Sequence, residues 1–183
     1  MIALNRSDQY QLHNCSRRGY KCIEPHCLQK TIYPPACALH MKLIYGVEIK
    51  TTKLVDSDLI PYRFLGVFAT RDFKRGDFVV PYLGELLNKQ TICAKYGSTE
   101  DTVAPYVLEI EDDMYVDAMN IRGVGGMVNM CQAHDTDRSL DKHISNNTHF
   151  RFVKGFYPFV KACKKIRAGD ELFIHYGDTY FKN

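Results

Sequence analysis

From residue 43 onward, apolar residues occur in short β-prone runs separated by turn residues, a pattern that predicts a mainly β protein. The expected strands are 43–49, 66–70, 77–83, 106–110, 114–117, 150–153, 159–163 and 171–176. Helical periodicity is scarce. One short helix is expected at 88–95, and 56–59 and 126–130 are further candidates. The chain is therefore expected to be mainly β with short helices.

Turn signals separate several of these runs. Lys74-Arg75-Gly76-Asp77 and Arg167-Ala168-Gly169-Asp170 each lead into an apolar run and predict two similar hairpin turns. The acidic stretch Glu111-Asp112-Asp113 predicts the turn of a hairpin over 106–117. Its charge either assists the encounter with a basic peptide or is simply that of a solvated turn. The polar stretch 132–146 predicts an exposed loop.

Residues 15–40 show neither period and are rich in cysteine, histidine and basic residues. The candidate metal ligands are Cys15, Cys22, Cys37 and His40, with Cys27 and His26 as alternatives. The close Cys-x2-His pair in this set has the spacing that clamps one side of a tetrahedral zinc. Four such ligands leave no open coordination position, so the predicted zinc is structural. Reduced, partly buried cysteines are the alternative.

The change in composition after residue 42 divides the chain into a Cys/His-rich module, residues 1–50, and a β-rich domain, residues 51–183. The net charge of +3 is too mild to indicate a nucleic-acid-binding protein by itself. A local contact is still expected from basic residues of the first module, and it would be weak and salt-sensitive. These residues are Arg17, Arg18, Lys21 and Lys30.

Seven cysteines, an odd number, favour reduced thiols over a disulfide framework. The start of the chain lacks an apolar signal core, and no stretch is long enough to span a bilayer. We therefore expect a soluble intracellular protein with no membrane partner.

The segment Glu171-Leu172-Phe173-Ile174-His175-Tyr176-Gly177 ends an apolar run on a tyrosine, and the glycine lets the backbone turn away. Alone, such a tyrosine usually packs with its hydroxyl in water. Three other stretches precede it in order: Phe64-Leu65-Gly66-Val67-Phe68-Ala69, Pro81-Tyr82-Leu83-Gly84-Glu85 and Gly126-Met127-Val128-Asn129-Met130-Cys131. Together, these four stretches resemble the SET-domain lysine methyltransferases from Phe64 to Tyr180.

This resemblance implies a SET fold, with small curved sheets and a C-terminal segment threaded beneath a loop. It implies methyl transfer from S-adenosylmethionine to a lysine on a histone tail or another basic protein, in the nucleus. The implied catalytic residues are Tyr176 and Tyr82, whose hydroxyls would face the target nitrogen. Tyr106 would line the same channel, and Tyr115 is a further candidate. For Tyr82 the alternative is a plain core position, because 79–83 is also a credible core strand.

By the same resemblance, the methyl donor contacts Phe64, Leu65, Gly66, Tyr106, Asn129, Met130 and Tyr176. Three positions depart from the family pattern: Phe64 replaces a glycine, Met130 a histidine and Gly126 an arginine. Main-chain contacts can survive such replacements. The departures nevertheless keep open an alternative, a degenerate SET domain that binds a histone tail or a nucleic acid without catalysis.

The peptide substrate is expected to add a strand to a sheet edge. Many family members close the lysine channel with a cysteine-rich segment after the tyrosine, and this sequence has none there. Tyr180 and Phe181, or a second subunit, are the expected means of closing the channel, which makes an oligomer one expectation.

Overall fold

The computed structural model describes residues 19–54, 64–97, 104–111, 113–131 and 145–176. Its strands are β1 (Tyr20–Lys21), β2 (Lys30–Thr31), β3 (Val47–Thr51), β4 (Leu65–Ala69), β5 (Phe78–Pro81), β6 (Glu85–Asn88), β7 (Val107–Glu111), β8 (Met114–Asp117), β9 (Thr148–Arg151) and β10 (Phe159–Ala162). Its helices are α1 (Ala38–His40), the π-helix η2 (Met41–Tyr45), α2 (Lys89–Tyr96) and the 3-10 helix η3 (Val124–Met127). The prediction of a mainly β protein with short helices is confirmed.

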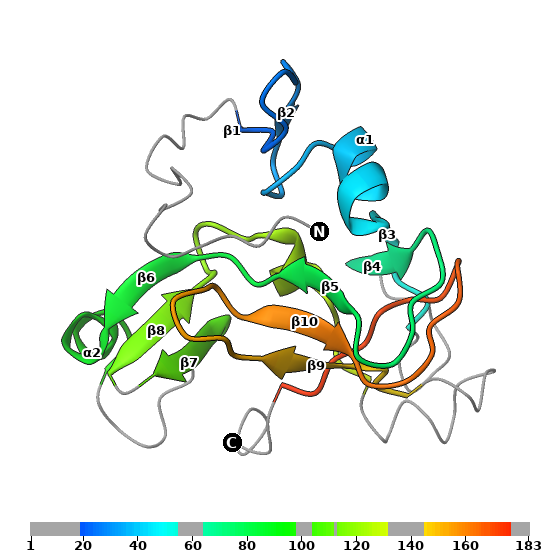
Figure 1. Ribbon diagram of the computed structural model, residues 1–183. Helices are drawn as coiled ribbons and strands as arrows, with labels where there is room; N and C mark the ends of the chain where they lie inside the picture. The colour runs from blue at the N-terminus through cyan, green and yellow to red at the C-terminus, as the bar shows by residue number, and fades with distance from the viewer. Residues whose placement is uncertain (1–18, 55–63, 98–103, 112, 132–144, 177–183) are drawn as a thin grey trace.

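Within these ranges the strands form four small antiparallel sheets, ordered β1-β2, β5-β10-β9, β3-β4 and β6-β8-β7. Figure 1 shows the β6-β8-β7 sheet and the β3-β4 pair on opposite sides of the β5-β10-β9 sheet. β7 lies at the edge of its sheet, where a further strand can pair with it. None of the helices described is long and apolar enough to cross a membrane.

The predicted hairpin over 106–117 and the predicted helix at 88–95 are both present. β7 pairs antiparallel with β8, and Asp113 in the turn has a φ of 61°. Asp112 lies outside the described residues. α2 begins after Asn88, whose side-chain oxygen accepts a hydrogen bond from Thr91 N at 2.9 Å. Both elements carry strong local signals, a turn sequence and a helix cap.

The two predicted Gly-Asp turns have the same internal hydrogen bond. Lys74 N donates to Asp77 Oδ2 at 2.8 Å, and Arg167 N donates to Asp170 Oδ2 at 2.7 Å. In each turn the aspartate closes the backbone three residues back, so the expected similarity is confirmed.

The predicted strand at 43–49 is wrong in its first half, because Met41–Tyr45 forms η2. Met41 and Tyr45 are both buried, and their spacing of four residues places them on one face of a helix. Gly46 ends the helix with a φ of 70°, a left-handed conformation that favours glycine. β3 begins immediately afterwards, at Val47.

The prediction of a regular strand at 171–176 is also wrong. The segment makes isolated bridges to β4, to Asn129 and to β9 instead of one regular ladder. Each bridge joins a different part of the chain, so among residues with a described structure the segment has no single partner strand. The helix expected at 126–130 is the 3-10 turn η3, and β1, β2 and β6 were not predicted. The candidate helix 56–59 lies outside the described residues, as does most of the predicted loop 132–146.

The Cys/His-rich segment and the β-rich part share one buried core. Cys22, Cys37, Met41 and Tyr45 belong to the same hydrophobic cluster as residues of β4, β5 and β10. The predicted boundary after residue 50 falls within β3, which pairs with β4. The division into a module and a domain stays a prediction.

Candidate functional site

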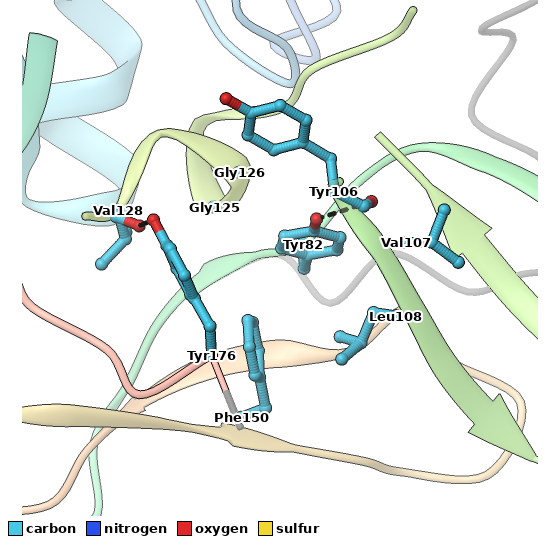
Figure 2. A pocket seen from close by; sticks show the side chains of 9 residues that line it. All are labelled: Tyr82, Tyr106, Val107, Leu108, Gly125, Gly126, Val128, Phe150 and Tyr176. Atoms are coloured by element: carbon cyan, nitrogen blue, oxygen red, sulfur yellow. Dashed lines mark hydrogen bonds between the residues drawn. The ribbon is translucent and has the colours of Figure 1, made fainter. Parts of the chain in front are cut away.

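A narrow pocket lies where the β5 end, the β7 start, η3, β9 and the segment 171–176 meet. It encloses about 40 Å³ and is lined by Tyr82, Tyr106, Val107, Leu108, Gly125, Gly126, Val128, Phe150 and Tyr176. Figure 2 shows these side chains around the cavity. The tyrosines implied as catalytic and channel-lining residues thus come together in one mostly apolar space.

Tyr176 is fixed at both its ring and its backbone. Its hydroxyl donates to Val128 O at 2.9 Å, and its backbone N–H donates to Met130 Sδ at 3.3 Å. Two residues earlier, Ile174 N donates to Asn129 O at 2.9 Å. The segment that carries Tyr176 is therefore bound along residues 128–130, so the phenol enters the pocket from a rigid support.

Tyr82 is buried, with 6% of its surface exposed, as its position at the end of β5 requires. Its hydroxyl donates to Tyr106 O at 2.9 Å, and its ring meets Phe150 edge to face with centroids 5.4 Å apart. The core and channel interpretations of Tyr82 thus both apply: the ring packs in the core while the hydroxyl reaches the pocket. Phe150 was not predicted as a site residue.

Tyr106 has a φ of 65°, which is unusual for a large side chain. The Arg122 guanidinium stacks on its ring at 3.5 Å from the centroid. Arg122 Cγ lies within 3.1 Å of where a Cβ at Gly126 would stand, so the glycine leaves room for this arginine. Buried Arg122 Nε has no hydrogen-bond partner among the described residues. Sequence reasoning missed Arg122, which has no recognisable motif of its own.

Tyr115, the further channel candidate, does not line this pocket. It lies on β8, and its hydroxyl is 3.5 Å from Glu109 Oε1. Burial, followed by the charge of Glu109, raises the pKa of Tyr115.

The segments expected to hold the donor lie together beside Tyr176. Phe64 and Leu65 are 41% and 36% exposed, while Gly66 is buried. Asn129 Nδ2 donates to Leu65 O at 3.1 Å and to Glu171 Oε1 at 3.2 Å. The amide therefore ties the first motif to the third.

Glu171 anchors this junction although it is almost fully buried. Its carboxylate accepts from Thr52 Oγ1 and Lys53 N, each at 2.7 Å. A Cβ at Gly66 would collide with Glu171 Oε1, so a side chain there would displace the carboxylate. Sequence reasoning did not assign Glu171 a role. The available signal was an acid opening an otherwise apolar run.

A second cluster brings together Cys22, Cys27, Cys37 and His40, whose ligand atoms all lie within 4.8 Å of one another. We call it the Cys/His cluster. His40 Nδ1 lies 3.4 Å from Cys22 Sγ and 3.3 Å from Cys37 Sγ. Cys27 completes the set here, while Cys15 lies outside the described residues and His26 is exposed.

The thiol chemistry of the Cys/His cluster suits metal binding. Burial raises the pKa of Cys37, but hydrogen bonds from His40, Cys27 and Cys22 outweigh burial and lower it to about 7. A lowered pKa favours the thiolate, which is the form that binds metals.

Comparison with known proteins supplies a family. The SET domain family model matches residues 65–177. The histone-lysine N-methyltransferase EZH2 of Chaetomium thermophilum is 28% identical over 122 residues, which is 63% of this chain and 7% of that protein. The N-lysine methyltransferase KMT5A of Xenopus tropicalis is 32% identical over 127 residues, which is 66% of this chain and 35% of that protein. The chain thus spans a minor part of these relatives.

Solved structures share the fold. The polycomb repressive complex 2 of Chaetomium thermophilum matches with a TM-score of 0.51 and 24% identity, over 72% of this chain and 15% of that chain. The complex ctPRC2 in an autoinhibited conformation bound to S-adenosylmethionine matches with a TM-score of 0.51 and 23% identity, over 75% of this chain and 16% of that chain. The methyltransferase domain of human PR domain-containing protein 2 matches with a TM-score of 0.50 and 17% identity, over 81% of this chain and 95% of that chain.

Proposed function

This chain belongs to the SET domain family, and we propose that it is a protein lysine methyltransferase that takes its methyl group from S-adenosylmethionine. The observation that carries this proposal is the meeting of Tyr82 and Tyr176 in one narrow aromatic pocket. The similarity to lysine methyltransferases such as KMT5A supports it.

Hydrogen bonding orients both phenols for the task. Each hydroxyl donates a hydrogen bond to a backbone carbonyl oxygen, as Figure 2 shows. The Tyr82 hydroxyl donates to Tyr106 O, and the Tyr176 hydroxyl donates to Val128 O. A phenol oxygen that donates its own proton can also accept a hydrogen bond. A lysine amine between them would donate its N–H groups to these oxygens, so its lone pair would be aimed by the protein.

The pocket also favours the neutral amine that methyl transfer needs. A free lysine has a pKa of about 10.4, so presenting it neutral at pH 7 costs roughly 4 to 5 kcal/mol. The described part of the lining is mostly aromatic and aliphatic and carries no carboxylate. Such surroundings disfavour the ammonium form and lower the cost.

S-adenosylmethionine, when bound, supplies a methyl group made electrophilic by its sulfonium. The residues present fit such a cation, because aromatic faces and backbone carbonyl oxygens attract a weakly hydrated positive charge. The exposed Phe64 and Leu65, with Asn129 and Met130 beside Tyr176, would hold the rest of the donor. One solved structure matched by this fold is described as bound to S-adenosylmethionine.

The proposed substrate is a histone tail or a similar basic peptide, bound along β7. Val107 and Leu108 line the pocket and lie on this edge strand, so a strand added there would pass the pocket mouth. Glu109 and Glu111 are exposed on the same strand, and their charge favours a basic peptide. Histone-modifying relatives support this substrate and a nuclear location.

We further propose that the Cys/His cluster holds one structural zinc ion. Three thiols and one imidazole form a soft, four-member donor set with no position left for a substrate. The ion would link β1, β2 and α1, which build little core of their own. The predicted set with Cys15 becomes a set with Cys27 in this proposal.

Two expected contacts stay predictions. Lys21 and Lys30 are exposed, consistent with a weak nucleic-acid contact, while Arg17 and Arg18 lie outside the described residues. Tyr180 and Phe181, expected to close the channel in the absence of a second subunit, lie outside them as well.

The deciding experiment is a radiolabelled methyl-transfer assay on mixed histones, run beside a titration with S-adenosylhomocysteine. Lysine-directed label together with measurable affinity supports the proposal. Absence of donor affinity would instead support the non-catalytic alternative that Phe64 and Met130 keep open.

A further inference from the structure

We propose that Glu171 is a positioning residue for the methyl donor, because together with Leu65 O it holds the Asn129 amide in one orientation. In the orientation it sets, Asn129 presents its carbonyl oxygen Oδ1 as the acceptor for the donor's ammonium group. This inference rests on the proposed function, since it takes the donor to bind beside Asn129.

The orientation of the amide follows from its partners. Leu65 O and the Glu171 carboxylate can only accept hydrogen bonds, so both must face the Asn129 NH₂ group. Oδ1 then points away from both. Within the described part of the chain no group donates to Oδ1. An ammonium has three N–H donors and no acceptor, and it therefore matches Oδ1 and is repelled by NH₂.

Glu171 is held firmly enough to impose this choice. Thr52 Oγ1 and Lys53 N fix its two oxygens, and both bonds are 2.7 Å long. Gly66 leaves the space that the carboxylate fills. The third bond, at 3.2 Å from Asn129 Nδ2, is the one directed at the donor side.

The conservative change Glu171→Gln would remove the bond by which Glu171 holds the Asn129 amide in this orientation. The new side-chain oxygen must stay on Lys53 N, a fixed donor, so the new NH₂ group faces Thr52 and Asn129. The Thr52 hydroxyl can rotate and accept. If the Asn129 amide keeps its orientation, two NH₂ groups face each other. If it turns, Oδ1 faces the Leu65 carbonyl oxygen and the NH₂ group faces the ammonium. In both cases Oδ1 is no longer held toward the donor.

The test is isothermal titration of S-adenosylhomocysteine and of its deaminated analogue, which lacks the ammonium. Glu171→Gln should weaken S-adenosylhomocysteine roughly 10- to 100-fold, the effect of losing one charge-assisted hydrogen bond. The analogue should bind wild type and variant alike. Thr52→Val is the matched control, because it removes another hydrogen bond of the same carboxylate but leaves Asn129 in place. The ratio of its affinity for S-adenosylhomocysteine to its affinity for the deaminated analogue should equal the ratio in wild type.

The outcomes separate the two proposals. A wild-type protein that binds neither ligand refutes the proposed function. If wild type binds and Glu171→Gln loses affinity for both ligands equally, or for neither, the positioning role alone is overturned. Should Glu171→Gln fail to fold, Asn129→Ala gives the decision: it must abolish the preference for the ammonium-bearing ligand, and a preserved preference overturns the inference.

Discussion

Removal of one hydroxyl, in Tyr176→Phe, tests the proposed chemistry most directly. The phenol donates to Val128 O at 2.9 Å and would accept from the target amine. A phenyl ring keeps the shape of the pocket wall and loses that acceptor. Loss of one preorganised polar group in an active site typically lowers turnover about 10²- to 10³-fold, or about 2.7 to 4 kcal/mol. We expect a decrease of that size.

The same change has a calculable structural effect. Val128 is 1% exposed, so its carbonyl oxygen loses a partner that water does not easily replace. An unsatisfied buried acceptor costs about 1 to 3 kcal/mol. For a chain of this size, each kcal/mol lowers the melting temperature by about 2 to 4 °C. The variant should therefore fold, melt at a somewhat lower temperature, and retain its affinity for S-adenosylhomocysteine.

Single-turnover transfer of labelled methyl to histones measures the chemical step. Tyr115→Phe is the matched control, because it removes a phenol hydroxyl outside the pocket and should leave turnover unchanged. If Tyr176→Phe is folded, binds S-adenosylhomocysteine and turns over at the wild-type rate, the assignment of Tyr176 is refuted.

Three further predictions concern the supports of the site. Arg122→Leu removes the cation from the strained pocket tyrosine and should raise KM for the peptide several-fold; unchanged kinetics would contradict this role. Elemental analysis should find about one zinc per chain, near none in Cys27→Ser and a full complement in Cys163→Ser, which lies outside the Cys/His cluster; a metal-free wild type would end the zinc proposal. The hydrogen bond to Asp117 raises the pKa of Lys95, so this bond stabilises the fold fully below about pH 10.4 and less as the pH rises through the raised pKa. The difference in melting temperature between wild type and Lys95→Met should shrink above that pH, and a constant difference would contradict the assignment.

The parts of the fold that sequence could predict are those with local signals. The β7–β8 hairpin follows from alternation and an acidic turn, and α2 follows from the Asn88 cap. The error at 43–49 has a physical cause. Leu43, Ile44 and Tyr45 look β-prone as a run, but the core selects Met41 and Tyr45, one helical turn apart. Tertiary packing overrides local propensity there.

The candidate site was predictable in its residues and not in its connections. The family resemblance supplied two tyrosines that we propose as catalytic, and the structure brings Tyr82 and Tyr176 into one pocket. The bond from Glu171 to Thr52 spans 119 residues, so no local pattern could reveal it. Spacing alone could not choose between Cys15 and Cys27 either, because both precede the Cys-x2-His pair at plausible distances.

Under the proposed function, the irregular segment 171–176 would serve both the donor site and the lysine site. At its start, Glu171 accepts a hydrogen bond from the Asn129 amide, and at its end Tyr176 lines the pocket proposed for the lysine. Between them, Leu172 and Ile174 are fully buried in the core and fix the distance from one to the other. A regular edge strand would form its backbone hydrogen bonds with one neighbouring strand, whereas this segment bridges three separate parts of the chain. A cavity at Leu172 or Ile174 should therefore weaken donor binding and turnover together, while substitution of Tyr176 separates them.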